Sequence, residues 1–130
     1  VARQLKLPRA DAIEIFRRMV FNVVARNHDD HTKNFGFLLD DMQSKWRLSP
    51  AFDLNPNIDK AEHALNLDIG DNRANLESVI ATAQYYELTQ DQAVQIVSEI
   101  LSVTRTWEAV AKNLAISRGD IELMRAAFQS

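Results

Sequence analysis

Residues 10–26 form an apolar stretch that contains neither Gly nor Pro, so nothing in it would break a helix. Its polar members recur at helical spacing, and apolar side chains fill most of the remaining positions. These polar positions are Asp11, Glu14, Arg18 and Asn22. A helix that is apolar on most sides has to be buried on most sides. The pattern therefore predicts a central core helix over residues 10–26.

Turn-forming residues are scarce in the rest of the chain as well. With 3 Gly and 3 Pro among 130 residues, the composition disfavours all-β folds, which need a turn about every ten residues. Apolar residues make up 46% of the chain and charged residues 25%, which is ordinary for a folded protein and excludes intrinsic disorder. A chain of this length has room for one core. We expect a single, predominantly helical domain over residues 1–130.

Two short strands are predicted after the core helix. Residues 35–39 and 45–49 have strand-like composition, and the second run alternates apolar with polar side chains. The polar residues 40–44 between them are typical of a turn, so we expect a β-hairpin. Residues 64–69 are a possible third strand. These strands make the expected fold class α+β, predominantly helical.

Helical patterns return from Leu76 and continue to the end of the chain. A first helix is predicted to about Tyr86. A long second helix is predicted to begin at Thr89, because Gln92 follows at the spacing of a capping box. Apolar residues mark one face of this long helix, which we expect to face the core. They are Val94, Val97, Leu101, Trp107, Ala111 and Leu114. A last short helix is expected after a cap at Ser117.

Charge and cysteine content exclude several classes of function. The chain has 15 Lys and Arg against 18 Asp and Glu, a net charge of −3, so it lacks the positive surface that nucleic acid or anionic lipid requires. The absence of Cys excludes disulfides, thiolate metal sites and cysteine nucleophiles. No apolar run approaches the roughly 18 residues of a membrane span. We expect no direct nucleic acid binding, no membrane contact and a cytoplasmic location.

The residues that carry chemistry are concentrated between the core helix and the hairpin. Residues 26–34 hold two carboxylates, two imidazoles, an ammonium group and amides. Such a segment can be a solvated turn, since Asp and Asn favour turns. Residues 49–53, Ser-Pro-Ala-Phe-Asp, add an acid after the second strand, where the hairpin returns it toward the loop. Asp29, Asn34 and Asp53 would then supply the oxygen ligands that Mg²⁺ prefers, although imidazole with carboxylate would also suit Zn or Fe.

An Asp, an Asn five residues later, a hairpin and a further Asp follow one another in the catalytic half of protein kinases. In detail, residues 27–35 (Asn-His-Asp-Asp-His-Thr-Lys-Asn-Phe) and 48–54 (Leu-Ser-Pro-Ala-Phe-Asp-Leu) resemble the HipA-like serine/threonine kinases. These are the toxins of bacterial toxin–antitoxin pairs. The chain departs from ordinary protein kinases, because His28 precedes the catalytic Asp, Lys33 follows it by four residues, and Leu54 follows Asp53.

The resemblance implies a fold, a reaction and roles for individual residues. It implies the C-terminal lobe of a protein-kinase-like fold, with the β-hairpin beside the catalytic loop, and ATP-dependent transfer of phosphate to Ser or Thr of a protein. Asp29 would accept or orient the proton of the attacking hydroxyl, and Asn34 and Asp53 would hold Mg²⁺ and with it ATP. Lys33 would face the γ-phosphate or Asp29, or remain solvated, and His31 would shape the loop more readily than transfer a proton. The family also implies a helix-turn-helix antitoxin as partner.

The groups that normally cover the phosphates of ATP are missing from the sequence. Gly36, Gly70 and Gly119 are isolated, so the chain has no Gly-rich phosphate loop. In the family that the chain resembles, these parts precede the catalytic loop, and the chain begins with Val1 rather than Met. We therefore expect a C-terminal fragment of a longer kinase that lacks the N-terminal nucleotide-binding part and is inactive alone.

Two other classes of function remain open. His28-Asp29 after a helix would fit a metal-dependent phosphohydrolase of the HD type, which needs a further His ligand upstream; residues 1–27 contain none. The helices between residues 76 and 128 would otherwise form a non-catalytic interaction module. A titration with Mg²⁺ and nucleotide distinguishes both classes from the kinase.

Overall fold

The computed structural model describes residues 6–27, 35–56 and 72–128. Their elements, in chain order, are α1 (Arg9–Val24), β1 (Phe37–Asp40), β2 (Lys45–Leu48), α3 (Asn72–Ala81), the 3₁₀ helix η3 (Ala83–Tyr86), α4 (Gln90–Thr104), α5 (Trp107–Asn113) and α6 (Arg118–Met124). The described part is mostly helical and has one two-stranded sheet. The predicted class, α+β and predominantly helical, is confirmed.

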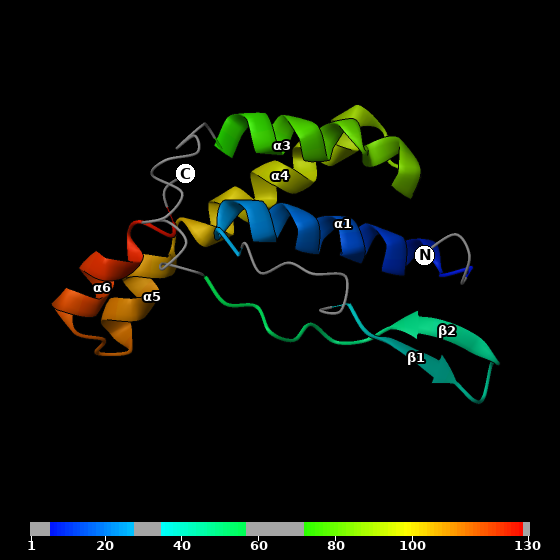
Figure 1. Cartoon of the computed structure of the whole chain (residues 1–130), viewed down its shortest axis with the longest axis horizontal. Coiled ribbons are helices and arrows are strands. Elements are labelled where there is room, and N and C mark those ends of the chain that lie inside the picture. The colour runs from blue at the N-terminus through cyan, green and yellow to red at the C-terminus, as the bar shows by residue number, and fades with distance from the viewer. Residues whose placement is uncertain (1–5, 28–34, 57–71, 129–130) are drawn as a thin grey trace.

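Helix α1 is the centre of the fold. It packs against α3, η3 and α4 and lies between α3 and the hairpin (Figure 1). Phe16 and Val20 of α1 are fully buried, and the ring of Phe16 lies 5.7 Å from the ring of Tyr86 in η3. The core also contains Val24, Ala83, Leu88, Ala93, Ile96, Val97 and Ile100. The prediction of a central core helix is confirmed, with its last turn ending at Val24.

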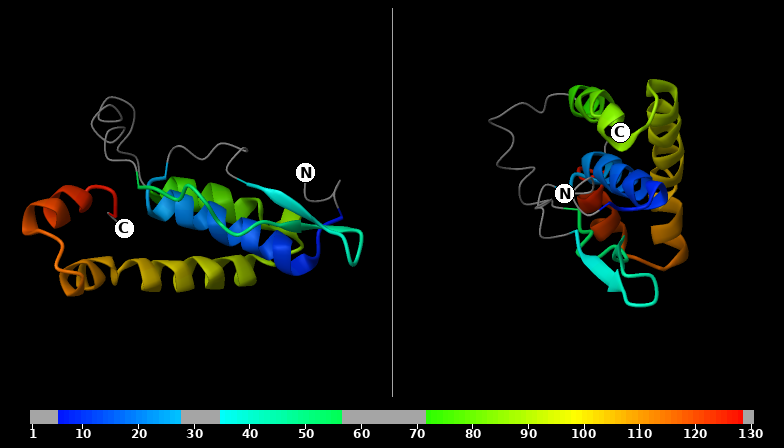
Figure 2. Two further views of the ribbon diagram at one scale, coloured as in Figure 1. Left: turned by 90° about the horizontal axis from the view of Figure 1, so that it is seen from below. Right: turned by 90° about the vertical axis from the view of Figure 1, so that its right-hand side faces the viewer.

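The hairpin projects from the helical body (Figure 2). Its strands are antiparallel, with Phe37 opposite Leu48 and Asp40 opposite Lys45. Asp40 closes the turn, because its Oδ1 accepts the backbone N–H of Met42 at 3.0 Å. The predicted hairpin is confirmed, although the first strand begins at Phe37 rather than at residue 35. The possible strand at residues 64–69 lies outside the described residues.

Helix α4 begins as the sequence predicts. Thr89 accepts the backbone N–H of Gln92 at 3.2 Å, and the Gln92 side chain accepts the backbone N–H of Thr89 at 2.9 Å, which completes a capping box. The first predicted helix of this half is divided into α3 and η3, which are joined by Thr82. Its end at Tyr86 agrees with the prediction.

The predicted long helix is wrong in its extent. Helix α4 ends at Thr104, and a turn separates it from α5. The hydroxyl groups of Thr104 and Thr106 donate to carbonyl oxygens three residues earlier, at 3.1 and 2.7 Å. Hydroxyl bonding to nearby carbonyls bends and weakens helices. The predicted apolar stripe also does not face one core: Val94, within α4, is 47% exposed, and Leu114, after the break, is 69% exposed.

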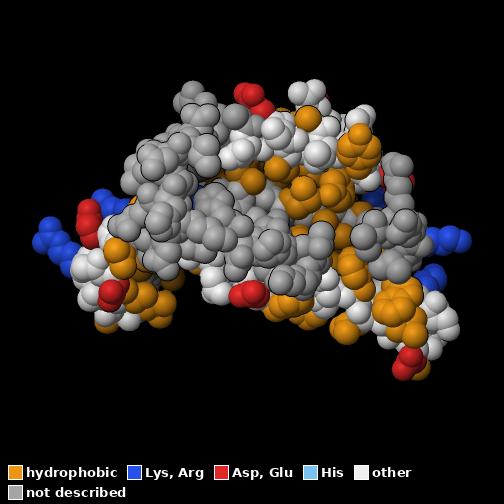
Figure 3. All heavy atoms as spheres, in the orientation of Figure 1, with side chains coloured by type: hydrophobic (Ala, Val, Ile, Leu, Met, Phe, Trp, Pro, Cys, Tyr) orange, Lys and Arg blue, Asp and Glu red, His pale blue; other side chains and the backbone are white. Residues whose placement is uncertain are grey.

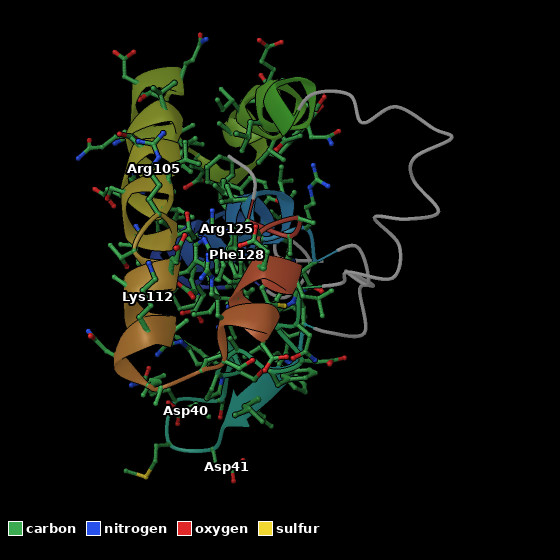
Figure 4. The ribbon with its side chains drawn as sticks, turned by 90° about the vertical axis from the view of Figure 1, so that its left-hand side faces the viewer. Asp40, Asp41, Arg105, Lys112, Arg125 and Phe128 are labelled. Atoms are coloured by element: carbon green, nitrogen blue, oxygen red, sulfur yellow. The ribbon has the colours of Figure 1, made fainter. Side chains whose placement is uncertain are left out.

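Helices α5 and α6 form a small C-terminal pair. Ser117 caps α6, since its Oγ accepts the backbone N–H of Asp120 at 3.1 Å, as predicted. The Trp107 ring stacks on Phe128 with centroids 4.9 Å apart, and Glu108 pairs with Arg125 at 2.7 Å. Figure 4 labels Arg125 and Phe128 beside α6. Exposed hydrophobic side chains lie over this pair and over the hairpin (Figure 3).

Within the described ranges, no helix has both the length and the apolar character needed to cross a membrane.

Candidate functional site

The chain segments that flank the two sequence motifs meet beside the C-terminal half of α1. They line a cavity of about 10 Å³, together with two side chains of the helix. The lining residues are Arg18, Asn22, Asn27, Phe35, Ala51, Phe52 and Leu54. Asn27 and Phe35 stand at the two ends of segment 28–34, and the last three surround Asp53 in the sequence. Both ends of the chemically dense segment are thus adjacent to the segment that carries Asp53.

Gly36 allows the two motifs to approach each other. The backbone N–H of Ser49 donates to the carbonyl oxygen of Gly36 at 2.8 Å. A Cβ on residue 36 would lie 2.8 Å from Ser49 Oγ and 3.2 Å from the ring of Phe52. These distances are too short for any larger residue without movement of a neighbour. Gly36 was seen in the sequence only as an isolated glycine, and its packing role was missed.

Asn27 is fixed to the last turns of α1. Its backbone N–H donates to the carbonyl oxygen of Asn22 at 2.8 Å, and its side-chain amide donates to Asn22 Oδ1 at 3.0 Å. Both side chains are buried. Arg26, between them, adopts a left-handed φ of 51°, which ends the helix. Asn27, the residue before segment 28–34, therefore has a defined place on α1.

Arg18 of α1 contacts the segment that leads to Asp53. Its Nη2 donates to the carbonyl oxygen of Ser49 at 2.8 Å, and its Nε donates to Glu14 at 3.1 Å. The Arg18 side chain is 10% exposed. Its Nη1 is buried and has no hydrogen-bond partner among the residues that the structure describes. A buried guanidinium that binds a backbone carbonyl fixes the chain irrespective of the side chain at that position.

Asp11, two turns earlier on α1, holds the end of β2. It accepts hydrogen bonds from Arg47 Nε at 2.8 Å and Nη2 at 3.0 Å, and from the backbone N–H of Leu48 at 2.9 Å. The hydrogen bond from Arg47 lowers the pKa of Asp11, and burial opposes this less strongly. The same contact raises the pKa of Arg47. Asp11 is therefore ionised at neutral pH and accepts hydrogen bonds from both a side chain and the backbone of β2.

Asp53 is exposed and has a backbone φ of 55°. Asp tolerates this left-handed conformation better than most residues. One carboxylate oxygen accepts from the Asn55 side chain at 3.0 Å. Among the described residues, Asp53 forms no ion pair and caps no helix. Its carboxylate is accessible to solvent, and hard oxygen donors of this kind suit Mg²⁺.

Comparison with known proteins decides the family. The model of the HipA-like C-terminal domain matches residues 1–107 of the chain. This chain belongs to the HipA-like family. A curated protein of Sinorhizobium fredii, named "Putative kinase Y4dM", is 32% identical over 115 residues, which cover 83% of this chain and 28% of that protein. No solved structure matches the chain.

The HipA-like domain thus spans about 28% of the length of its curated relative. The resemblance seen in the two motifs is confirmed at the level of the family. Of the predicted site residues, Asp53 lies within the described part of the structure, and the rest lie outside it: Asp29, His31, Lys33 and Asn34. Their roles stay predictions. Helix α6 and nearly all of α5 lie beyond the residues that the family model matches.

Sequence reasoning missed the residues of α1 that hold the HipA-like motifs in place. Asp11, Arg18 and Asn22 were recognised only as the polar positions of an otherwise apolar helix, and all three are buried. Buried polar side chains need hydrogen-bond partners, so a polar row on a helix predicted to be central was a usable signal. It could not reveal that Asp11 and Arg18 bind Arg47, Leu48 and Ser49, because these lie more than 30 residues away.

Proposed function

We propose that this chain is the catalytic-loop and metal-binding half of an ATP-dependent protein serine/threonine kinase of the HipA toxin type. Its membership of the HipA-like family supports this function, as does the name of its Sinorhizobium fredii relative. The observation that carries the proposal is the cavity where Asn27 and Phe35 meet Phe52 and Leu54. This contact brings the residues at both ends of segment 28–34 next to the second motif, which supports a shared phosphate-transfer site.

Each motif would contribute a distinct function. Asp29 would accept or orient the proton of the substrate hydroxyl, since phosphoryl transfer depends mainly on positioning and on charge stabilisation. Asn34 and Asp53 would hold Mg²⁺, which when bound neutralises charge on the phosphates of ATP. Lys33 would face the γ-phosphate, and His31 would fix the shape of the loop. The exposed carboxylate of Asp53, with Asn55 as its neighbour, suits such a cation.

The remaining parts of the proposed enzyme would come from outside this chain. The groups over the β- and γ-phosphates would belong to an N-terminal nucleotide-binding part, so the chain alone would be inactive. The substrate would be a protein that carries Ser or Thr. A helix-turn-helix antitoxin would be the regulatory partner, and the complex would be cytoplasmic.

Substitution of the proposed base tests the function. In the full-length protein, Asp29→Asn is expected to lower phosphate transfer to a protein substrate by about 100-fold or more, because positioned bases contribute at least that much. Binding of ATP, measured by calorimetry, should be largely retained. The matched control is Asp41→Asn in the exposed hairpin turn (Figure 4). Retention of more than about a tenth of the wild-type rate would contradict the assignment of Asp29.

Metal dependence separates the kinase from the two alternatives. Asp53→Asn and Asn34→Ala should each raise the Mg²⁺ concentration needed for half-maximal transfer. A phosphohydrolase of the HD type would instead release phosphate from a phosphoester with no ATP present. An interaction module would show neither reaction, and its backbone signals would not respond to Mg²⁺ with nucleotide.

A further inference from the structure

We propose that Asp11, Arg18 and Asn22 of α1 are positioning residues that fix the segment carrying Asp53 relative to Asn27, the residue that precedes segment 28–34. The inference rests on the proposed kinase function, because it assigns Asp53 and Asn34 to one cation. It concerns three buried polar side chains on one helix, each bonded to a segment that flanks a motif. None of them would touch substrate or metal.

Polar contacts attach the hairpin to α1. Two-stranded sheets are marginally stable on their own, and several apolar side chains of this hairpin are exposed. Leu38 is 57% exposed, Leu39 49%, Met42 96% and Trp46 41%. Leu38 and Met42 in particular gain little from burial. Asp11 accepts hydrogen bonds from Arg47 and Leu48 of β2, and Arg18 donates one to Ser49, so these contacts influence where the hairpin ends.

The segment between Leu48 and Asp53 passes these contacts on to the carboxylate. Asp11 accepts the N–H of Leu48, and Arg18 binds the carbonyl oxygen of Ser49, so two consecutive residues are fixed through their backbone. Pro50 then limits its own φ and the conformation of the preceding residue. Asp53 follows three residues later and is held by the contact with Asn55. A shift at Ser49 would therefore be passed on to Asp53.

The same helix also holds Asn27, the first residue of the other motif. Asn22, one turn after Arg18, bonds both the backbone and the side chain of Asn27, the residue before segment 28–34. Helix α1 is anchored in the core, where Phe16 and Val20 are fully buried. The positions of Ser49 and Asn27 relative to each other are therefore tied to the spacing of Arg18 and Asn22 on one helix. Residues that orient metal ligands in this way typically contribute about 10- to 100-fold to metal affinity or activity.

The experiment uses the full-length protein and three variants. Arg18→Met removes the hydrogen bond to the Ser49 carbonyl oxygen, and Asp11→Ala removes the acceptor of the Leu48 N–H. Asp11→Asn keeps an acceptor for the Leu48 N–H. The matched control is Arg17→Met on the same helix, because Arg17 forms an exposed ion pair with Glu99 at 3.0 Å that is remote from both motifs. Arg18→Lys serves as the milder variant if Arg18→Met fails to fold.

The decisive readout is the Mg²⁺ concentration for half-maximal transfer, measured below the melting temperature of each variant. Arg18→Met and Asp11→Ala should raise it by about 10-fold, Asp11→Asn by less, and Arg17→Met by less than 2-fold. Equal Mg²⁺ dependence in all folded variants, with only lower thermal stability, would overturn the positioning role and leave a structural one.

A second readout does not depend on activity. Hydrogen exchange at residues 48–53 should be faster in Arg18→Met and Asp11→Ala than in the wild type, and unchanged in Arg17→Met. If the wild type transfers no phosphate, the proposed function fails and the exchange data alone decide on the positioning role. Unchanged exchange at residues 48–53 in both variants would then overturn it.

Discussion

The backbone N–H of Ser49 donates to the carbonyl oxygen of Gly36 at 2.8 Å, and this bond extends the pairing of the hairpin beyond its strands. It joins the residue two positions after Asn34 to the residue four positions before Asp53. Because a Cβ at residue 36 would need Ser49 or Phe52 to move, the close approach of these two segments depends on a glycine at this position.

The first prediction is that Gly36→Ala destabilises the protein by about 1 to 3 kcal/mol, the usual cost of overpacking. Ser49→Ala removes the Oγ at 2.8 Å, so the double variant should lose less than the sum of the two single variants. Chemical denaturation measures all three.

The control is Gly119→Ala in α6, where a Cβ meets open space apart from Ser117 Oγ at 3.9 Å. That change should stabilise the helix by about 0.5 to 1 kcal/mol. Strict additivity of Gly36→Ala and Ser49→Ala would show that no close contact exists.

The second prediction concerns the pH dependence of the Asp11–Arg47 contact. The pKa of Asp11 is lowered in the folded protein from its ordinary value of 3.8 by the hydrogen bond from Arg47. A lowered pKa means that the stabilisation is fully present above the unfolded pKa and is lost as the pH falls through the folded pKa. The difference in unfolding free energy between wild type and Asp11→Asn should be constant from neutral pH to about pH 5 and shrink below pH 4.

The Arg47→Met background provides the control for this pH dependence. Without the guanidinium, the main cause of the lowered pKa is gone, so Asp11→Asn should have an effect that changes little with pH. A difference between wild type and Asp11→Asn that stays constant down to pH 2.5 would mean that Asp11 is not paired in the folded protein.

Local patterns in the sequence were sufficient to predict the elements that hold themselves in shape. The core helix follows from its apolar period, α4 and α6 from the capping residues Thr89 and Ser117, and the hairpin from two short runs around polar residues 40–44. Each of these signals acts within a few residues of the chain. The break after Thr104 was missed because a continuing apolar period hides competing hydroxyl bonds.

Contacts between distant parts of the chain were beyond a reading of one sequence. Asp11 and Arg47 are 36 residues apart, and nothing near either residue indicates the other. The close approach of Gly36 and Ser49 likewise exists only after the hairpin has formed. For the candidate site, the motifs predicted the family, which the comparison confirmed. The roles of Asp29, Asn34 and Asp53 stay predictions.

The third prediction concerns Tyr86, whose hydroxyl donates to Met19 Sδ at 2.9 Å. Sulfur is a weak acceptor, so Tyr86→Phe should cost less than about 1 kcal/mol. Phe16→Ala, at the fully buried neighbour, should cost about 3 to 5 kcal/mol.

Burial raises the pKa of Tyr86 from 10.0. The stabilisation by the protonated, half-buried hydroxyl is thus present below the unfolded pKa and lost as the pH rises through the folded pKa. Wild type should lose stability relative to Tyr86→Phe above about pH 10, and a constant difference would contradict burial of the hydroxyl.

The fourth prediction separates the C-terminal helix pair from the core. Trp107 is half-buried and stacks on Phe128 at 4.9 Å, so Trp107→Ala should cost about 1 to 3 kcal/mol, less than a fully buried aromatic residue. The loss should be local, because small units at the edge of a fold open independently of the core. Hydrogen exchange should become faster in α6 and stay unchanged in α1 around Phe16 and Val20. Trp46→Ala on the exposed hairpin controls for the general loss of an indole. An equal loss of protection in α1 and α6 would show instead that Trp107 belongs to the same cooperative unit as the core.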